Sequence, residues 1–303
     1  MSNKSSISAG PLVWLITGCT SGFGQLFVSA IRARGDRVIA TARNIASLAQ
    51  FADTEGVFLL QLDVTDSQDE LNRKAVAAIQ HFGQIDVLVN NAGYVLSGVW
   101  EEVSHDEAVE QFRTNFFGHI NVTRAFLPHM RSRRSGTILF MSSIAGWMGV
   151  AAGGPYSASK FALEGAVESL HKEVQPLGIR VHLIVLGQFR TSILNADRRR
   201  IVRQRPAIRD YDAVVAGLTN RQAETNGKQP GDPSQAVERI LDVVRGEGWT
   251  PDGQRISLRV VLGSDAAHII RNQCLETLRQ MDDLDGLTRS TDFPNAGEVK
   301  EYK

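Results

Sequence analysis

Residues 12–24 read LVWLITGCTSGFG, an apolar, β-branched run that passes directly into a glycine-rich turn. The run predicts a buried strand, and the residues from Gly22 onward have helical spacing. Glycines let the backbone approach a ligand closely, while a helix N-terminus offers free N–H groups to an anion. At the first strand–helix junction of an α/β chain this predicts a site for the pyrophosphate of a dinucleotide; a tight turn without a ligand is the alternative.

The same alternation continues along most of the chain. Apolar runs typical of parallel strands covered on both faces lie at residues 12–17, 37–42, 57–62, 85–90, 136–142, 180–185 and 256–262. Helical periodicity lies between them, at residues 22–34, 66–82, 106–131, 156–174, 233–245 and 265–281. We therefore expect an α/β fold, a doubly wound parallel sheet of Rossmann type. A single domain over residues 1–303 is favoured, since no linker rich in proline, glycine or serine divides the first 190 residues.

Two stretches depart from this rhythm. Residues 188–232 contain no predicted strand and far exceed an ordinary connection of about 4–6 residues. We expect them to form a variable substrate lid or, alternatively, a mobile segment. Residues 282–303 are polar and without a clear period, so a tail that is extended over the surface or frayed is expected.

Composition narrows the class of protein. Lys+Arg and Asp+Glu number 33 each, which argues against a general affinity for nucleic acid or acidic membranes. Neither a membrane span nor a signal-peptide core is predicted, and the two cysteines cannot make a disulfide framework. The histidines are scattered and HExxH is absent, so no metal site is expected. The expectation is a cytoplasmic protein without nucleic-acid or membrane partners.

The end of the second predicted strand bears on the cofactor. An acidic residue there would bind the ribose 2′-hydroxyl of NAD, whereas an arginine accommodates the 2′-phosphate of NADP. Here the strand ends in Arg43, which predicts NADP(H) unless Arg43 is simply a solvated residue at a helix start. Asp63 closes the third strand and is expected on the adenine side of the site or, alternatively, as the cap of the following helix.

Three polar residues predict acid–base chemistry. Tyr156 and Lys160 are four residues apart and share one face of a predicted helix, and Ser143 ends the neighbouring strand at the ligand-binding edge of the sheet. An ammonium group stabilises a phenolate, so Lys160 is expected to lower the pKa of Tyr156. The Ser143 hydroxyl could hydrogen-bond a substrate carbonyl.

Together these motifs resemble the short-chain dehydrogenase/reductase family. The resemblance rests on Thr17-Gly18-x-x-x-Gly22-x-Gly24, Asn90-Asn91-Ala92-Gly93, and Ser143 with Tyr156-x-x-x-Lys160. It is close over residues 12–192 and reaches residue 282 in outline. One departure is Leu186, where the family usually has proline; we expect a looser strand exit there.

The resemblance implies a role for each matching residue. Tyr156 would be the proton donor in reduction, Lys160 would bind the nicotinamide ribose, Ser143 would orient the carbonyl, and Asn115 would hold a water of a proton relay. Cofactor-binding roles are implied for Gly18, Thr20, Ser21, Gly22, Gly24, Arg43, Asp63, Asn91, Ala92, Gly93, Tyr156, Lys160 and Thr191. Family members commonly pair through the helices around Asn115 and Tyr156, so a homodimer or homotetramer is expected.

The leading hypothesis is NADPH-dependent reduction of a hydrophobic or aromatic ketone. One alternative is an NADP-dependent alcohol dehydrogenase acting on a steroid or retinol-like substrate, and another is a non-catalytic NADP-binding sensor. An apolar substrate pocket is expected from Tyr94, Trp147, Met148, Val150, Phe189 and Ile193. The seven arginines within residues 190–209 suggest either a basic lid over an anionic substrate or a solvated helical face.

Overall fold

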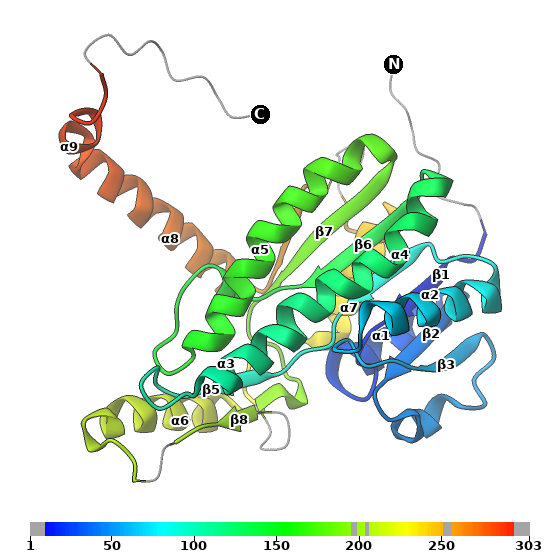
Figure 1. The fold of residues 1–303 in the computed structure, drawn as a ribbon, viewed down its shortest axis with the longest axis horizontal. Coiled ribbons are helices and arrows are strands. Elements are labelled where there is room, and N and C mark those ends of the chain that lie inside the picture. Colours follow the sequence, from blue (N-terminus) through cyan, green and yellow to red (C-terminus); the bar gives the residue numbers. More distant parts are fainter. Residues whose placement is uncertain (1–9, 195–198, 204–205, 251–255, 294–303) are drawn as a thin grey trace.

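A computed structural model describes residues 10–194, 199–203, 206–250 and 256–293. Its centre is a seven-stranded parallel sheet with the order β3-β2-β1-β4-β6-β7-β9 (Figure 1). The strands are β1 (Val13–Ile16), β2 (Arg37–Ala42), β3 (Val57–Gln61), β4 (Val87–Asn90), β6 (Gly136–Met141), β7 (Ile179–Leu186) and β9 (Arg259–Leu262). The strand order reverses between β1 and β4, where open α/β sheets bind ligands. The predicted doubly wound, single-domain fold is confirmed.

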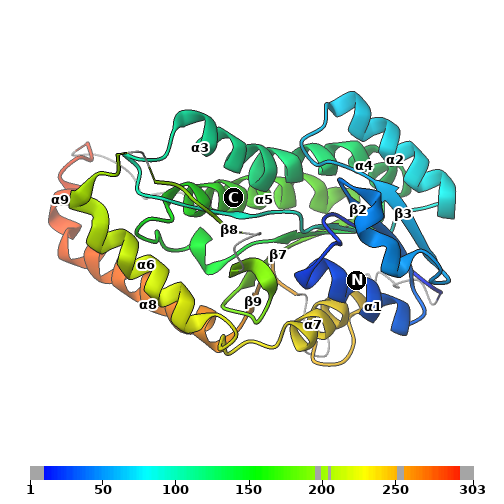
Figure 2. The same cartoon turned by 90° about the horizontal axis from the view of Figure 1, so that it is seen from below.

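Helices cover both faces of this sheet (Figure 2). One face carries α1 (Gly22–Ala33) and α7 (Pro233–Arg245), and the other carries α2 (Gln68–Phe82), α4 (His119–Arg133) and α5 (Gly154–Val174). Side chains alternate along β1. Trp14 and Ile16 pack in the core on the side of α1 and α7, while Val13 and Leu15 pack in the core on the side of α2, α4 and α5. Short 3₁₀ turns occupy Ile45–Phe51, Ile144–Gly146, Gln175–Leu177, Ser192–Leu194 and Arg209–Tyr211.

The helix expected over residues 106–131 is present, but its middle is π-helical, which the sequence did not predict. Helix α3 (His105–Phe112) is followed by a π-helical turn, Arg113–Gly118, before α4 begins. The widened turn carries Asn115, whose Nδ2 donates to the Tyr94 carbonyl at 3.0 Å and whose Oδ1 accepts from the Tyr94 N–H at 3.2 Å. Such π turns often accompany functional sites. Here the turn fixes the loop that follows β4.

The expectation that residues 188–232 contain no strand is wrong. Strand β8 (Arg199–Ile201) pairs in parallel with β5 (Val95–Ser97), a second strand that the sequence did not predict. The segment then forms α6 (Asp212–Thr225), whose Leu218 packs with Val99 and Ala152. Both strands have three residues, too few to show a period-two pattern.

The C-terminal part is more regular than expected. Helix α8 (Ser264–Asp283) and α9 (Asp285–Arg289) project away from the sheet in Figure 1. The extended conformation expected from residue 282 is therefore wrong through residue 289, and residues 294–303 lie outside the described residues. Within the described part, no helix is long and apolar enough to span a membrane.

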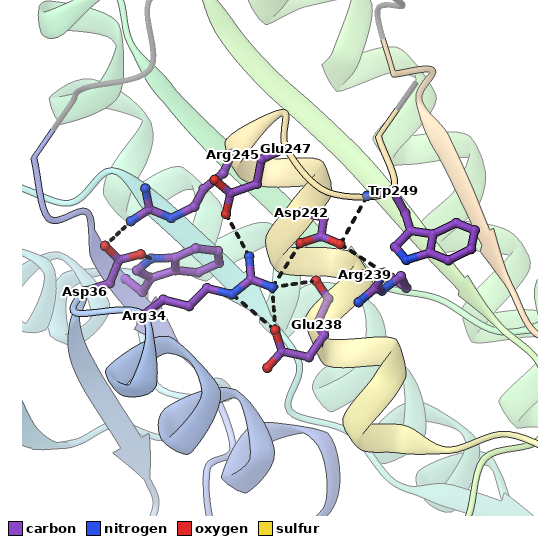
Figure 3. A network of polar contacts seen from close by, with 9 residues as sticks. Arg34, Asp36, Glu238, Arg239, Asp242, Arg245, Glu247 and Trp249 are labelled. Carbon is purple, nitrogen blue, oxygen red and sulfur yellow. Dashed lines mark hydrogen bonds and ion pairs between the residues drawn. The ribbon is translucent and has the colours of Figure 1, made fainter. Parts of the chain in front are cut away.

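Ion pairs join α1 to α7 at the amino edge of the sheet (Figure 3). The Arg34 guanidinium contacts Glu238, Asp242 at 2.9 Å and Glu247 at 2.9 Å. Nearby, buried Asp36 accepts hydrogen bonds from the Leu12 N–H and the Trp14 indole, both at 2.9 Å, and pairs with Arg245. These contacts fix the start of β1. They lie at the amino edge of the sheet, opposite the carboxyl edge where the candidate site is found.

Candidate active site

The glycine turn after β1 is shaped by two close approaches. Gly18 has φ +74, and a Cβ there would lie 3.0 Å from the Ala92 Cα. A Cβ at Gly24 would lie 2.2 Å from the Gly18 carbonyl oxygen, so Gly24 lets α1 pack directly beneath the turn. The N-cap side chain, Ser21, makes no capping hydrogen bond to the first turn of α1. The turn therefore combines a close backbone approach with a helix N-terminus that its own N-cap side chain does not cover.

Thr17 and Asn91 join the loops that follow β1 and β4. The Thr17 hydroxyl oxygen accepts from the N–H groups of Asn91 and Ala92 at 2.9 and 3.0 Å. The Asn91 amide donates in return to the carbonyls of Thr17 and Gly18 at 2.9 and 3.1 Å. No role for Thr17 was predicted from the motif. Its place in Thr-Gly, directly before the turn, was the available signal.

A cleft of about 800 Å³ lies over these loops, within the range of small-molecule sites. Ten of the residues predicted to bind the cofactor line it: Gly18, Thr20, Ser21, Gly22, Arg43, Asp63, Asn91, Ala92, Gly93 and Thr191. Gly24 packs under the turn rather than lining the cleft. All ten residues follow the carboxyl ends of strands, from β1 to β7. The open helix N-terminus, the glycine turn and the cleft size fit a bound dinucleotide.

Arg43 and Asp63 lie on the wall formed by β2 and β3. Arg43 is exposed, and its carbonyl accepts from the Gln61 amide at 3.0 Å. Asp63 Oδ1 accepts from the N–H and the hydroxyl of Thr65 at 2.9 and 2.8 Å. Helix α2 is capped instead by Ser67, so the alternative that Asp63 caps this helix is wrong.

The structure brings Ser143, Tyr156 and Lys160 together at the carboxyl end of β6. Ser143 follows the strand, and its hydroxyl is hydrogen-bonded to Tyr156 near the start of α5. One helical turn further, Lys160 lies with its ammonium nitrogen 5.9 Å from the centre of the Tyr156 ring. That ammonium donates to the Met141 carbonyl at 2.7 Å, which anchors α5 to β6.

Burial controls the ionisation of this group. Loss of solvent raises the pKa of Tyr156, and the hydrogen bond from Ser143 opposes the rise. Burial lowers the pKa of Lys160 to about 8, against the attraction of the Glu164 carboxylate. The direction for Tyr156 is opposite to the lowering expected from the sequence, because desolvation outweighs the favourable contacts of the phenolate. At neutral pH the phenol is therefore protonated.

Asn115 and Thr191 flank the site. Asn115 is buried in the π turn, where it binds the Tyr94 backbone, and a Cβ on Gly93 would lie 3.2 Å from its Oδ1. Thr191 faces the glycine turn: a Cβ at Gly22 would lie 3.7 Å from the Thr191 Cβ. Asn115 thus holds the loop after β4, and Thr191 closes the cleft from the opposite side.

The strand exit after Leu186 is held by hydrogen bonds from two backbone N–H groups. The Gly187 N–H donates to the Leu262 carbonyl at 2.9 Å, and the Gln188 N–H donates to Asp265 at 2.7 Å. Strand β9 and the first turn of α8 therefore fix the residues that follow β7, and the looser exit expected from Leu186 stays a prediction.

The expected apolar pocket is only partly formed by its predicted residues. Tyr94 and Ile193 line the cleft. Phe189 is instead buried against Phe23, with ring centres 5.6 Å apart. Trp147 packs on the core and under the Arg259 guanidinium, 5.4 Å from its ring. Phe189 and Trp147 therefore belong to the core that supports the site.

Two arginines of the predicted lid pair with acidic groups. Arg200 lines the cleft and contacts Glu107 at 2.8 Å. Arg203 contacts buried Glu102 at 3.3 Å and Asp212 at 2.6 Å. These ion pairs fasten the segment to the body of the protein, and the basic lid stays a prediction. Among the described residues, no group of three or more His, Cys, Asp or Glu could hold a metal ion.

Comparison with known proteins agrees with this geometry. The short chain dehydrogenase family matches residues 12–201, and the chain belongs to this family. A 3-ketodihydrosphingosine reductase of Bacteroides thetaiotaomicron is 38% identical over 234 residues, which cover 76% of this chain and 84% of that protein. Human 17-beta-hydroxysteroid dehydrogenase type 1 is 37% identical over 198 residues, or 60% of this chain and 58% of that one. A short-chain dehydrogenase of Streptomyces avermitilis has a similar structure, with TM-score 0.83 and 34% identity over 94% of this chain and 100% of its own.

Proposed function

We propose that this protein is an NADPH-dependent reductase of ketones and that Tyr156 is its proton donor. The observation that carries the proposal is the convergence of Ser143, Tyr156 and Lys160 at the carboxyl end of β6. Two relatives are named for chemistry between a ketone and an alcohol, the 3-ketodihydrosphingosine reductase and the 17-beta-hydroxysteroid dehydrogenase. Their names support this reaction class for the present chain.

The cofactor preference rests on the wall of the cleft beside β2. The glycine turn and the N-terminus of α1 would bind the pyrophosphate, and Arg43 would meet a 2′-phosphate on the adenosine ribose. No carboxylate stands at the end of β2, where NAD would require one. When bound, the nicotinamide supplies a hydride to the carbonyl carbon.

The protein's own side chains would bind and protonate the carbonyl oxygen of the substrate. The Ser143 hydroxyl donates a hydrogen bond to the carbonyl oxygen and holds it beside Tyr156. As the C=O π bond opens, the Tyr156 O–H transfers its proton to that oxygen, and the product is an alcohol. The phenolate regains a proton through Lys160, with Asn115 proposed to hold a water of this relay.

The raised pKa of Tyr156 keeps the phenol at neutral pH in the protonated form that reduction requires. A phenol that stays protonated at neutral pH is ready to donate, whereas alcohol oxidation needs the phenolate as a base. Oxidation of a steroid or retinol-like alcohol uses the same residues and should require a higher pH. A sensor that binds NADP without turnover is the further alternative, and it predicts NADPH binding with no consumption.

A substrate screen tests the proposal. Aromatic polyketides and steroid ketones form the first panel, and loss of NADPH absorbance is followed with NADH as the parallel cofactor. We expect consumption of NADPH by at least one ketone and a slower reaction with NADH. NADPH binding without consumption across the panel would favour the sensor.

We also infer a substrate lid, an oligomeric state and a cellular location for this protein. Residues 188–232 are proposed to act as the substrate lid. Assembly as a homodimer or homotetramer is supported by Phe117 and Phe161, which lie near Asn115 and Tyr156 with 51% and 47% of their surfaces exposed. Free thiols at Cys19 and Cys274 support a cytoplasmic location.

A further inference from the structure

Glu164 lies beneath the catalytic residues, one helical turn after Lys160 on α5. Only 7% of its side chain is exposed. One carboxylate oxygen accepts from the Ser142 hydroxyl at 2.5 Å, and the other accepts from Arg259 Nε at 2.8 Å. A buried carboxylate is costly unless it is paired and hydrogen-bonded, and Glu164 meets both conditions.

Arg259 connects this carboxylate to the last strand of the sheet. It lies on β9, and its second nitrogen contacts Glu168 on α5 at 2.9 Å. Its guanidinium also covers the Trp147 ring, in the loop that follows Ser143. Glu164 is thus the point at which β6, α5 and β9 meet under the site.

Lys160 is surrounded by few charged groups. Glu164 attracts its ammonium from the same helix, His119 faces it from α4, and the Tyr156 ring lies above it. Burial keeps His119 neutral by lowering its pKa to about 3. Glu164 therefore supplies the negative charge that acts on Lys160.

We propose that Glu164 is a positioning residue for the reductase reaction. Through Ser142 it fixes the end of β6, and hence Ser143, against α5. Its carboxylate also favours the protonated state of the Lys160 ammonium. The inference rests on the proposed function for its kinetic test, while its electrostatic part can be measured without a substrate.

Two substitutions separate the two actions of Glu164. Glu164→Gln removes the charge but keeps the length of the side chain, so the Lys160 pKa should fall below its value of about 8. The alkaline limb of the kcat–pH profile should then move to lower pH by about half a unit or more. Ser142→Ala removes the hydrogen bond without changing a charge. It should lower kcat about tenfold with no movement of that limb.

Glu168→Gln is the matched control. Glu168 contacts the same arginine from the same helix, but 42% of its side chain is exposed, and it forms ion pairs with Arg259 and Lys172. We expect the wild-type profile in this variant. Arg259→Lys keeps a cation beside Glu164 and should retain most of the wild-type pH dependence.

The Lys160 pKa can also be followed by ¹³C NMR of labelled lysine, with the signal assigned by its loss in Lys160→Arg. An unchanged Lys160 pKa in folded Glu164→Gln would overturn the electrostatic part, whether or not a ketone has been found. Wild-type kcat in Ser142→Ala would overturn the positioning part, and this test stands even if Glu164→Gln does not fold. Failure of the wild-type enzyme to reduce any ketone would count against the proposed function alone.

Discussion

At the amino edge of the sheet charged side chains pair with one another, whereas at the carboxyl edge they surround a cleft. Arg34, Asp36 and Asp242 meet partners of opposite charge and tie α1, α7 and the start of β1 together. At the other edge Arg43 is exposed to the cleft, and the Lys160 ammonium donates to a backbone carbonyl. The ion pairs at the first edge stabilise the fold, whereas at the other edge the exposed Arg43 stays available for a ligand.

The largest expected effect is a loss of stability without a loss of kcat, caused by a substitution at the amino edge. Asp36→Asn would leave Arg245 facing a neutral group in a buried position and should lower the free energy of unfolding by about 3–5 kcal/mol. Urea denaturation measures this loss. The kcat of the folded variant should stay unchanged, because Asp36 lies at the edge away from the cleft; a large fall in kcat would show that the two edges are coupled.

The next effect compares two glycines of similar backbone conformation. Gly18→Ala combines φ +74 with a Cβ only 3.0 Å from Ala92, so NADPH affinity should fall about tenfold or more. Gly35 has φ +81 and no atom within 4 Å of its Cβ position, at the turn before β2. Gly35→Ala should cost some stability and leave NADPH affinity unchanged. Equal losses of affinity in a fluorescence titration would contradict a phosphate site at Gly18.

Two arginines at opposite ends of β2 test the cofactor preference. Arg43→Asp should shift the ratio of kcat/KM for NADPH over NADH about tenfold toward NADH, since a carboxylate repels the 2′-phosphate and can bind a 2′-hydroxyl. Arg37 begins the same strand at the amino edge and stacks over Phe82. Arg37→Asp should leave the ratio as it is. An unchanged ratio in Arg43→Asp would rule out a contact between Arg43 and the cofactor.

The smallest effect is a pH dependence of stability. Burial lowers the pKa of His119 from 6.5 to about 3, so between these values the unfolded chain binds a proton that the folded protein does not. This group should therefore reduce stability by about 1.4 kcal/mol for each pH unit below 6.5. His119→Gln should remove this component of the slope. Identical slopes from pH 6 to 5 would mean that His119 is protonated in the folded protein.

The sequence predicted the parallel, doubly wound sheet and the residues of the candidate site where patterns were long and local. The run before Gly18 and the spacing of Tyr156 and Lys160 predicted both the sheet edge and the cluster that the structure contains. Strands β5 and β8 were missed because three residues carry no periodic signal, and their pairing joins segments about a hundred residues apart.

Other errors came from contacts that no local pattern records. The π turn at Asn115 depends on its hydrogen bonds to Tyr94, and the helical spacing on either side conceals it. Phe189 was assigned to a pocket, although Phe23 buries it. The pKa of Tyr156 was expected to fall beside Lys160, but desolvation depends on the whole surrounding protein.

Replacement of Tyr156 by phenylalanine tests the central claim most directly. The change removes the phenolic O–H and keeps the ring, so NADPH should bind with nearly wild-type affinity while the single-turnover rate of ketone reduction falls by roughly 10²–10⁴. A reduction rate within a few-fold of wild type, at equal NADPH occupancy, would contradict the role of Tyr156 as proton donor.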